Sequence, residues 1–346
     1  MRLHATLGSC LRHALAACVC AAPLAAQARF ATTVLGQSSG TGGGGINNPA
    51  NALGAPQGGG LVQGSLHVHT LGIGGSLTLE LGVAAVDGPG CDLVVYENGF
   101  QLAGTGLVFT EGIHLEVASN GVDYARMPGR YQGPIGGFPG APGAPWGVLS
   151  GVAGGTPVLA NASTNAIDPF NPAVAGGDCF DLAELAAHPL VLAGLLDLQA
   201  VRQVRLVDVV EGVSLDSQGA PIWDNSGSFG SADVDAVAVV QTAATVAAGQ
   251  PRADLSIDAA GHLVLEISDP DGFGDLVQPQ CKASWNLAPI SLTRLRGLLP
   301  QVAPIQGGVR MRSATPIAGS GRRAMLSVSV VDTTGLFSVD QIALQG

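Results

Sequence analysis

Ser76-Leu77-Thr78-Leu79-Glu80-Leu81 is the stretch of sequence that decides the fold class. Its residues alternate strictly, so the three leucines share one face while the threonine and the glutamate share the other. This period of two is typical of a β-strand with one face in a core and one face toward solvent. Half-buried strands occur mainly in antiparallel sheets, so the stretch predicts an antiparallel β-protein.

Further strand candidates flank this stretch, each bounded by Gly, Pro, Asn or Asp. They cover residues 66–71, 92–97, 113–118, 201–210 and 234–241. The clearest helical segment in this part of the chain starts at Asp181, which is a suitable N-cap, and we expect Pro189 to limit it. One short helix cannot cover a parallel sheet. We therefore expect residues 29–246 to form an all-β sandwich domain.

A second β pattern follows a boundary at residues 243–252, where the sequence has no usable period. Alternation returns at residues 255–257, 263–267 and 326–330, and a final strand runs through Val339, Ile342 and Leu344. About a hundred residues of this kind fit a small immunoglobulin-like sandwich, although the Cys and Trp hallmarks are missing. We assign residues 247–346 to this second, smaller domain.

The composition of the 346 residues excludes several classes of protein. With 51 Gly and 21 Pro, long helical bundles and coiled coils are ruled out. Hydrophobic residues make up 47% of the chain and charged residues only 12%, which is enough apolar surface for one large core or two medium ones. The net charge is -11, and Lys282 is the single lysine among 15 basic residues. No basic run exists, so we expect no nucleic-acid partner.

The N-terminus has the pattern of a secretory signal peptide. Arg2 and Arg12 precede an apolar run over residues 14–22, and Ala26-Gln27-Ala28 supplies small residues for cleavage after Ala28. The run is too short to span a bilayer, and no later stretch is longer. We therefore expect residues 1–28 to be removed and the mature chain to be exported without a transmembrane segment. It would lie outside the cell, at the cell surface or in the periplasm.

Several acidic residues sit at the ends of apolar strands. Burying carboxylates is costly unless a cation or hydrogen bonds neutralise them. Calcium is the expected extracellular cation, because it takes six to eight oxygens from carboxylates, carbonyls and amides. The alternative is that each carboxylate caps a turn or helix on its own. We predict a structural calcium site among five ligands, namely Asp87, Asp92, Asp178, Asp181 and Asp233.

Histidines offer a second set of metal ligands. His67 and His69 lie on one face of a predicted strand, and His114 is a conceivable third ligand. The alternative, which we favour, is that the first two simply occupy the solvent face of their strand.

Aromatic residues are few, at 4% of the chain, so those near loops stand out. Sugar rings stack on aromatic faces, which makes these side chains candidate ligand-binding groups. Local packing of long loops explains each of them equally well. The predicted ligand-binding residues are Tyr96, Phe100, Tyr131, Trp146 and Trp223.

Two motifs, Asn48-Pro49-Ala50-Asn51-Ala52-Leu53-Gly54 and Asp92-Leu93-Val94-Val95-Tyr96-Glu97-Asn98-Gly99, belong to a longer ordered series. The other members cover residues 74–79, 86–90, 117–123, 175–178, 180–183 and 204–209. As a set, the series resembles a family of secreted bacterial cell-surface proteins, often planctomycete or proteobacterial. The resemblance implies a jelly-roll similar to galactose-binding and discoidin-type domains, a fold that often carries structural calcium and binds sugars. It implies no enzymatic activity.

Three of the six cysteines leave with the signal peptide, and Cys91, Cys179 and Cys281 remain. In the family that the chain resembles, positions 91 and 179 are not normally cysteine. Two such changes, each beside a candidate metal ligand, are easiest to understand if the two loops are neighbours. We therefore predict a Cys91–Cys179 disulfide and a free thiol at Cys281; the alternative is three buried free thiols.

Three functions remain open on the sequence alone. The first is a non-catalytic surface protein that binds a glycan or another surface polymer. The second is a purely structural component of the envelope or matrix. The third is a secreted hydrolase, for which no spacing singles out an acid/base pair or an activated nucleophile. The sequence does not indicate an oligomeric state.

Overall fold

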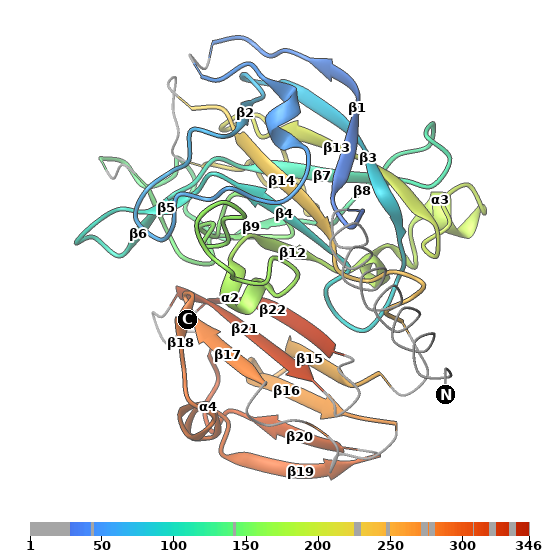
Figure 1. The fold of residues 1–346 in the computed structure, drawn as a ribbon. Helices are drawn as coiled ribbons and strands as arrows, with labels where there is room; N and C mark the ends of the chain where they lie inside the picture. The colour runs from blue at the N-terminus through green and yellow to red at the C-terminus, as the bar shows by residue number, and fades with distance from the viewer. Residues whose placement is uncertain are drawn as a thin grey trace, which may run out of the picture.

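The computed structural model describes residues 28–42, 45–140, 143–224, 230–246, 250–270, 276, 281–306, 308–317, 323–331 and 337–345. Apart from Ala28, the predicted signal peptide lies outside these residues. The fold is all-β, as predicted, with antiparallel ladders and short helical segments (Figure 1). None of the described helices has both the length and the apolar character needed to cross a membrane.

Two facing sheets form the first half of the chain. The first sheet has the strand order β1 (Ala31–Ser38), β3 (Ser76–Ala85), β13 (Val201–Asp208), β7 (Ile113–Ala118) and β8 (Ala125–Arg126). The second sheet has the order β12 (Asp178–Phe180), β4 (Leu93–Glu97), β14 (Asp233–Val239) and β2 (His69–Thr70). Leu79 and Leu115 from the first sheet meet Leu93 and Val95 from the second in the largest hydrophobic core.

Long loops between these strands carry small elements of their own. They form the ladders β5 (Phe100–Gln101), β6 (Leu107–Phe109) and β10 (Ala144–Pro145), and β9 (Arg130–Tyr131) with β11 (Leu149–Ser150). The helical turns are η1 (Pro49–Ala52), α2 (Pro172–Ala175), η2 (Leu182–Leu185) and α3 (Pro189–Leu192). Asp181 caps η2 as expected, since its carboxylate accepts a hydrogen bond from the Ala183 N–H at 2.8 Å.

Some sequence expectations were wrong in detail. The strand expected over residues 66–71 is reduced to β2, and Pro189 starts a new helical turn rather than only limiting η2. Proline suits the first helical position because its missing N–H would be unpaired there anyway. The sequence analysis missed β1, an edge strand whose residues are mostly exposed and therefore carry no clear alternation.

The second half of the chain is a smaller pair of sheets. One has the order β15 (Arg252–Ile257), β16 (Leu263–Ser268), β20 (Gly308–Arg312) and β19 (Gln301–Ile305). The other has β18 (Ala288–Pro289), β17 (Lys282–Trp285), β21 (Arg323–Val331) and β22 (Phe337–Gln345). Helix α4 (Leu292–Leu298) begins at its N-cap Ser291 and packs Leu295 into the core between these sheets.

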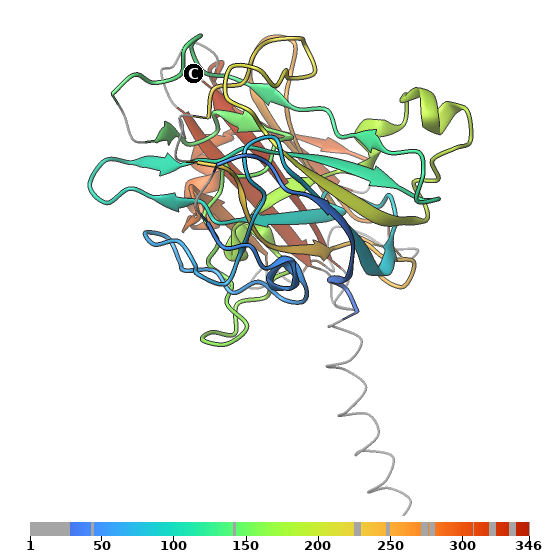
Figure 2. The ribbon, with the colours of Figure 1, turned by 90° about the horizontal axis from the view of Figure 1, so that it is seen from above.

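The two halves are joined by direct packing. Val94 and Tyr96 point from β4 away from the first core and share a second hydrophobic cluster with Val339 of β22. The Cys91 N–H donates to the Val339 carbonyl at 2.9 Å, and strands of the second half lie beneath those of the first (Figure 2). The second sheet is therefore buried on both faces, which explains why every residue of β4 is buried.

Trp146 makes a further contact across the junction. It packs with Val108 of the first half and with Leu287 and Met325 of the second. The predicted boundary near residue 246 separates the strand ladders, yet side chains from both sides share hydrophobic clusters.

We expect this shared packing to couple unfolding of the two halves. Val339 is fully buried, so Val339→Asp places an unpaired carboxylate in the junction and should lower the free energy of unfolding by at least about 3 kcal/mol. Val302→Asp, at a position 59% exposed on β19, is the matched control and should change it by less than about 0.5 kcal/mol. Thermal unfolding followed by circular dichroism and tryptophan fluorescence measures both; equal melting temperatures for the two variants would contradict the coupling.

Candidate functional site

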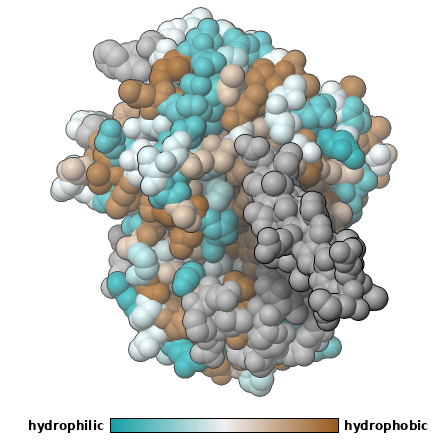
Figure 3. Space-filling model, in the orientation of Figure 1, coloured by the Kyte–Doolittle hydropathy of each residue, from teal (hydrophilic) through white to brown (hydrophobic). Residues whose placement is uncertain are grey.

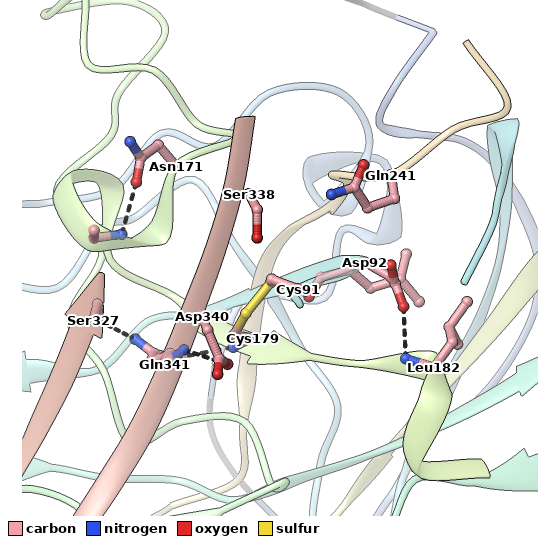
Figure 4. The surroundings of a disulfide bond; sticks show 12 residues. Cys91, Asp92, Asn171, Cys179, Leu182, Gln241, Ser327, Ser338, Asp340 and Gln341 are labelled. Carbon is pink, nitrogen blue, oxygen red and sulfur yellow. Dashed lines mark hydrogen bonds between the residues drawn. A yellow bond between two sulfur atoms is a disulfide. The ribbon is translucent and has the colours of Figure 1, made fainter. Parts of the chain in front are cut away.

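Cys91 and Cys179 form a disulfide bond, the pairing expected from the sequence. The sulfurs are 2.02 Å apart and the Cα atoms 5.5 Å apart, across 88 residues of sequence. The bond links the start of β4 to β12, which pairs with it (Figure 4). Cys281 is the free cysteine of the described residues and is half-buried. The disulfide therefore fixes the loops that carry Asp92 and Asp178.

Three of the five predicted calcium ligands meet beside this disulfide. Asp87, Asp92 and Asp181 each offer a carboxylate oxygen within 4.8 Å of the other two; we call them the junction carboxylates. Asp87 follows β3, Asp92 precedes β4 and Asp181 precedes η2, so three strand and helix ends converge here. Within the described ranges, this is the one group of three or more His, Cys, Asp or Glu side chains that meets this spacing.

Backbone amides hold the junction carboxylates in place. Asp92 accepts hydrogen bonds from the Gly88 N–H at 2.9 Å and from the Leu182 N–H at 2.7 Å (Figure 4). Burial, and secondarily the charge of Asp181, raise the pKa of Asp92 to about 9. Burial also raises the pKa of Asp181, to about 6. Two N–H donors do not offset the loss of water around these charges, so the ionised form of the group is unfavourable without a compensating charge.

The second half of the chain contributes charges to the same place. Asp340 of β22 accepts hydrogen bonds from the N–H groups of Leu255 and Gln341 at 2.6 and 2.7 Å. Burial raises its pKa to about 7, and the charges of Asp181 and Asp254 act in the same direction. Arg252 acts in the opposite direction on Asp87 and Asp181. The junction carboxylates thus lie where the two halves meet.

Asp178 lies apart from this group. Its carboxylate accepts hydrogen bonds from the N–H groups of Gly154 and Gly155 at 2.7 and 3.1 Å and from the Thr156 hydroxyl at 2.8 Å. It is buried, and burial raises its pKa to about 6. These donors use its oxygens to hold the loop, which is the capping role that the sequence analysis left open as the alternative.

Asp233, the fifth predicted ligand, belongs to a different acidic group at the far end of β4. It lies near Glu97, which ends β4, and near Glu111, because its charge raises the pKa of both. Burial is the larger cause, and the pKa of Glu111 reaches about 9. The sequence analysis did not select Glu111, since it follows the short strand β6 rather than a long apolar strand.

Two of the five predicted ligand-binding aromatics are in the interior. Tyr96 is fully buried and its hydroxyl donates to the Pro169 carbonyl, while Trp146 is packed into the junction. Neither presents a ring face to solvent, so these two assignments are wrong. Tyr96 is buried because the second sheet is covered on both faces, and Trp146 because both halves pack against it.

Phe100, Tyr131 and Trp223 are partly exposed residues, although the indole Nε1 of Trp223 is buried. Phe100 stacks on Phe109 with ring centroids 5.3 Å apart. Tyr131 and Phe138 pack against the cluster that contains Ile222, the neighbour of Trp223. Tyr131 therefore lies near the segment that carries Trp223, whereas Phe100 belongs to a separate aromatic pair.

Acidic side chains surround these loops. Burial raises the pKa of Tyr131 to about 12, and the charges of Asp224 and Glu211 add to the shift. The Trp223 ring rests on Gly212, where an added Cβ would lie 2.8 Å from a ring carbon. On the coloured part of the face shown in Figure 3, hydrophobic and hydrophilic areas alternate.

The three histidines do not form a metal site of the kind considered above. The described part of the chain has no group of three ligands that includes them within 4.8 Å. His69 lies on β2 and His114 on β7, which belong to different sheets. His114 is buried, and neither of its ring nitrogens has a hydrogen-bond partner among the described residues.

No protein-family model matches this chain, and a search of curated proteins finds no relative. The function must therefore be inferred from the chain's own residues.

His114 should make the fold sensitive to acid. Burial, and then the charge of Arg126, lower its pKa to about 4, while Glu116 and Asp216 act in the opposite direction. Between about pH 6.5 and about pH 4, His114 is protonated in the unfolded chain but neutral in the folded chain. The free energy of unfolding therefore decreases as pH falls through this range. His114→Leu should unfold with nearly the wild-type free energy at pH 7 and be more stable by about 2 kcal/mol at pH 4.5. Urea unfolding of both proteins at pH 7 and pH 4.5 tests this. If the free energies of unfolding of the variant and the wild type differ by the same amount at both pH values, the prediction is contradicted.

Proposed function

We propose that this chain is an exported, non-catalytic surface protein that binds a glycan or another surface polymer through loop aromatics, with structural calcium. The observation that carries the proposal is that Tyr131 and Trp223 are both partly exposed and that Tyr131 packs against the cluster containing Ile222, with the charge of Glu211 nearby. Sugar binding commonly combines an aromatic face with acceptors for the ring hydroxyls. The proposal agrees with the resemblance to secreted cell-surface proteins of galactose-binding type.

Export is supported by how the chain continues after the predicted cleavage site. Arg29 donates to the carbonyls of Val239 and Val240 at 3.0 and 2.7 Å, and its guanidinium lies 3.7 Å from the centroid of the Phe170 ring. The first residue of the expected mature chain is therefore already held by the fold. The disulfide is a second support, because such bonds persist in oxidising compartments.

Calcium is supported by the junction carboxylates. Three carboxylates within 4.8 Å repel one another, and a hard cation with oxygen ligands would remove the repulsion. An ion there would also stabilise the junction. Asp340 of the second half lies close enough to Asp181 for the charge of Asp181 to raise the pKa of Asp340.

We expect chelation to destabilise the protein and calcium to restore it. At one hundred times the dissociation constant, calcium should add about 2.7 kcal/mol to the free energy of unfolding. Asp181→Asn should lose most of this gain while keeping its helix cap, because Asn is an equally good N-cap. Asp197→Asn is the control, since Asp197 makes the same local bond, to the Gln199 N–H, on an exposed loop. If the Asp181 and Asp197 variants respond equally to calcium in thermal unfolding, the junction carboxylates are not the site.

Binding should depend on the loop aromatics. On a broad glycan array, Tyr131→Ala or Trp223→Ala should weaken a positive signal roughly tenfold, as expected for the loss of one stacking ring. Tyr124→Ala is the matched control: Tyr124 is also partly exposed, but lies 4.3 Å below the Arg205 guanidinium on the outer face of the first sheet. Equal losses in all three variants would contradict the assignment.

A structural envelope or matrix protein is the second candidate. The direct packing of the two halves favours it, because two sandwiches held together in this way can act as a spacer without binding a ligand. Absence of any array signal for the folded wild-type protein would favour this function over glycan binding.

A further inference from the structure

A cavity lies between the two sheets of the second half, beside helix α4; we call it the sheet cavity. Its volume is about 290 Å³. Ile267 of β16, Met311 of β20 and Val328 of β21 line it from the two sheets, and Leu295 lines it from α4. Helix α4 lies at one side of these sheets, between β18 and β19 (Figure 1). Because protein interiors are normally close-packed, a space of this size is room for a small organic ligand.

The wall of the sheet cavity is almost entirely apolar. Val309 and Met311 on one strand, and Val328 and Val330 on another, line it as pairs two residues apart, since alternate side chains of a strand share a face. Apolar cavities stay dry and take up apolar molecules instead of water. Unfilled volume in a core also lowers stability, so an occupant stabilises the fold. The part of a ligand that enters the cavity is therefore a hydrocarbon.

The charged side chains at the edge of the cavity are both cationic. They belong to Lys282, the first residue of β17, and to Arg296 of α4, and both residues are exposed. None of the described residues that line the cavity is acidic, although the chain has 26 acidic and only 15 basic residues. No ion pair between described residues includes Arg296. Positive charge beside an apolar cavity is complementary to an anionic head group on a hydrocarbon tail.

We propose that the sheet cavity binds a free amphiphile with one hydrocarbon chain and a carboxylate, of the medium-chain fatty-acid class. The chain fills the space between the sheets, and the carboxylate faces Arg296 and Lys282. The volume is at the lower end of the usual range for ligand pockets, which favours one short chain over a two-chain lipid. The net charge of -11 opposes docking on an anionic bilayer. The site is independent of the junction carboxylates and of the loop aromatics.

Calorimetric titration of the full chain with sodium decanoate tests the proposal. Arg296→Gln should weaken decanoate binding roughly fivefold, the upper value expected for one exposed ion pair. Arg294→Gln is the matched control and should leave the affinity unchanged, because Arg294 is exposed on the same helix but does not line the cavity. Decanol, which has the same chain without the charge, should bind both variants with equal affinity. Absence of decanoate binding to the folded wild type, or equal losses in the two arginine variants, would overturn the proposal.

Cys281 reports occupancy at the cavity itself, because it is a free, half-buried thiol that lines the wall. At about ten times its dissociation constant, decanoate should slow alkylation of Cys281 by iodoacetamide about tenfold, as measured by peptide mass spectrometry. Heat of binding with an unchanged alkylation rate would place the decanoate elsewhere and reject the cavity.

Two other occupants are distinguished by the same measurements. If a second copy of the chain covers the cavity, sedimentation should detect a dimer that protects Cys281 without decanoate. If the site is a membrane contact, the protein should sediment with phosphatidylglycerol vesicles and fail to bind decanoate. Either result would overturn the proposal, whereas decanoate protection of a monomer that does not sediment with vesicles supports it.

Discussion

Burial of the second sheet on both faces is the constraint on which the rest of this structure depends. One face of β4 packs on the first sheet and the other on β22 and the loop around Phe170. A strand in this position has no solvent side, so residues 93–96 are all apolar, in contrast to the alternating β3. Polar groups can enter only at the strand ends.

The two ends of β4 are where the acidic groups lie. Asp92 precedes the strand and belongs to the junction carboxylates, whereas Glu97 ends it beside Glu111 and Asp233. Five extended residues span roughly 17 Å, so the groups are separate in space. Each brings together segments that are distant in sequence at one end of a strand whose residues are all buried. The Cys91–Cys179 disulfide adds a covalent link at the first end.

The sequence was informative where one physical effect dominates. Alternation identified β3 and β7, the Asp181 cap identified η2, and carboxylates at the ends of apolar strands identified three residues that do converge. The sequence was not informative where the burial or the hydrogen bonds of a side chain depend on residues far along the chain. Tyr96 is buried mainly by the distant loop around Phe170, and Trp146 by residues of both halves. Asp178 and Asp92 both flank strands but differ in which amides reach them. Local sequence cannot distinguish these cases, because burial and register are set by segments far along the chain.

The direction of the pKa shifts links these carboxylates to the surroundings of the protein. Burial raises the pKa of Asp92 and Glu111 to about 9, so the folded chain binds more protons than the unfolded chain between about pH 4 and pH 9. For these groups, stability is therefore greatest in acid and falls as pH rises through this range. A bound cation reverses the penalty, because it stabilises the ionised form that is otherwise unfavourable. The same residues would thus offer two folded forms, one protonated and, if a cation binds, one ionised. In the second form these charges would stabilise the fold at neutral pH instead of opposing it.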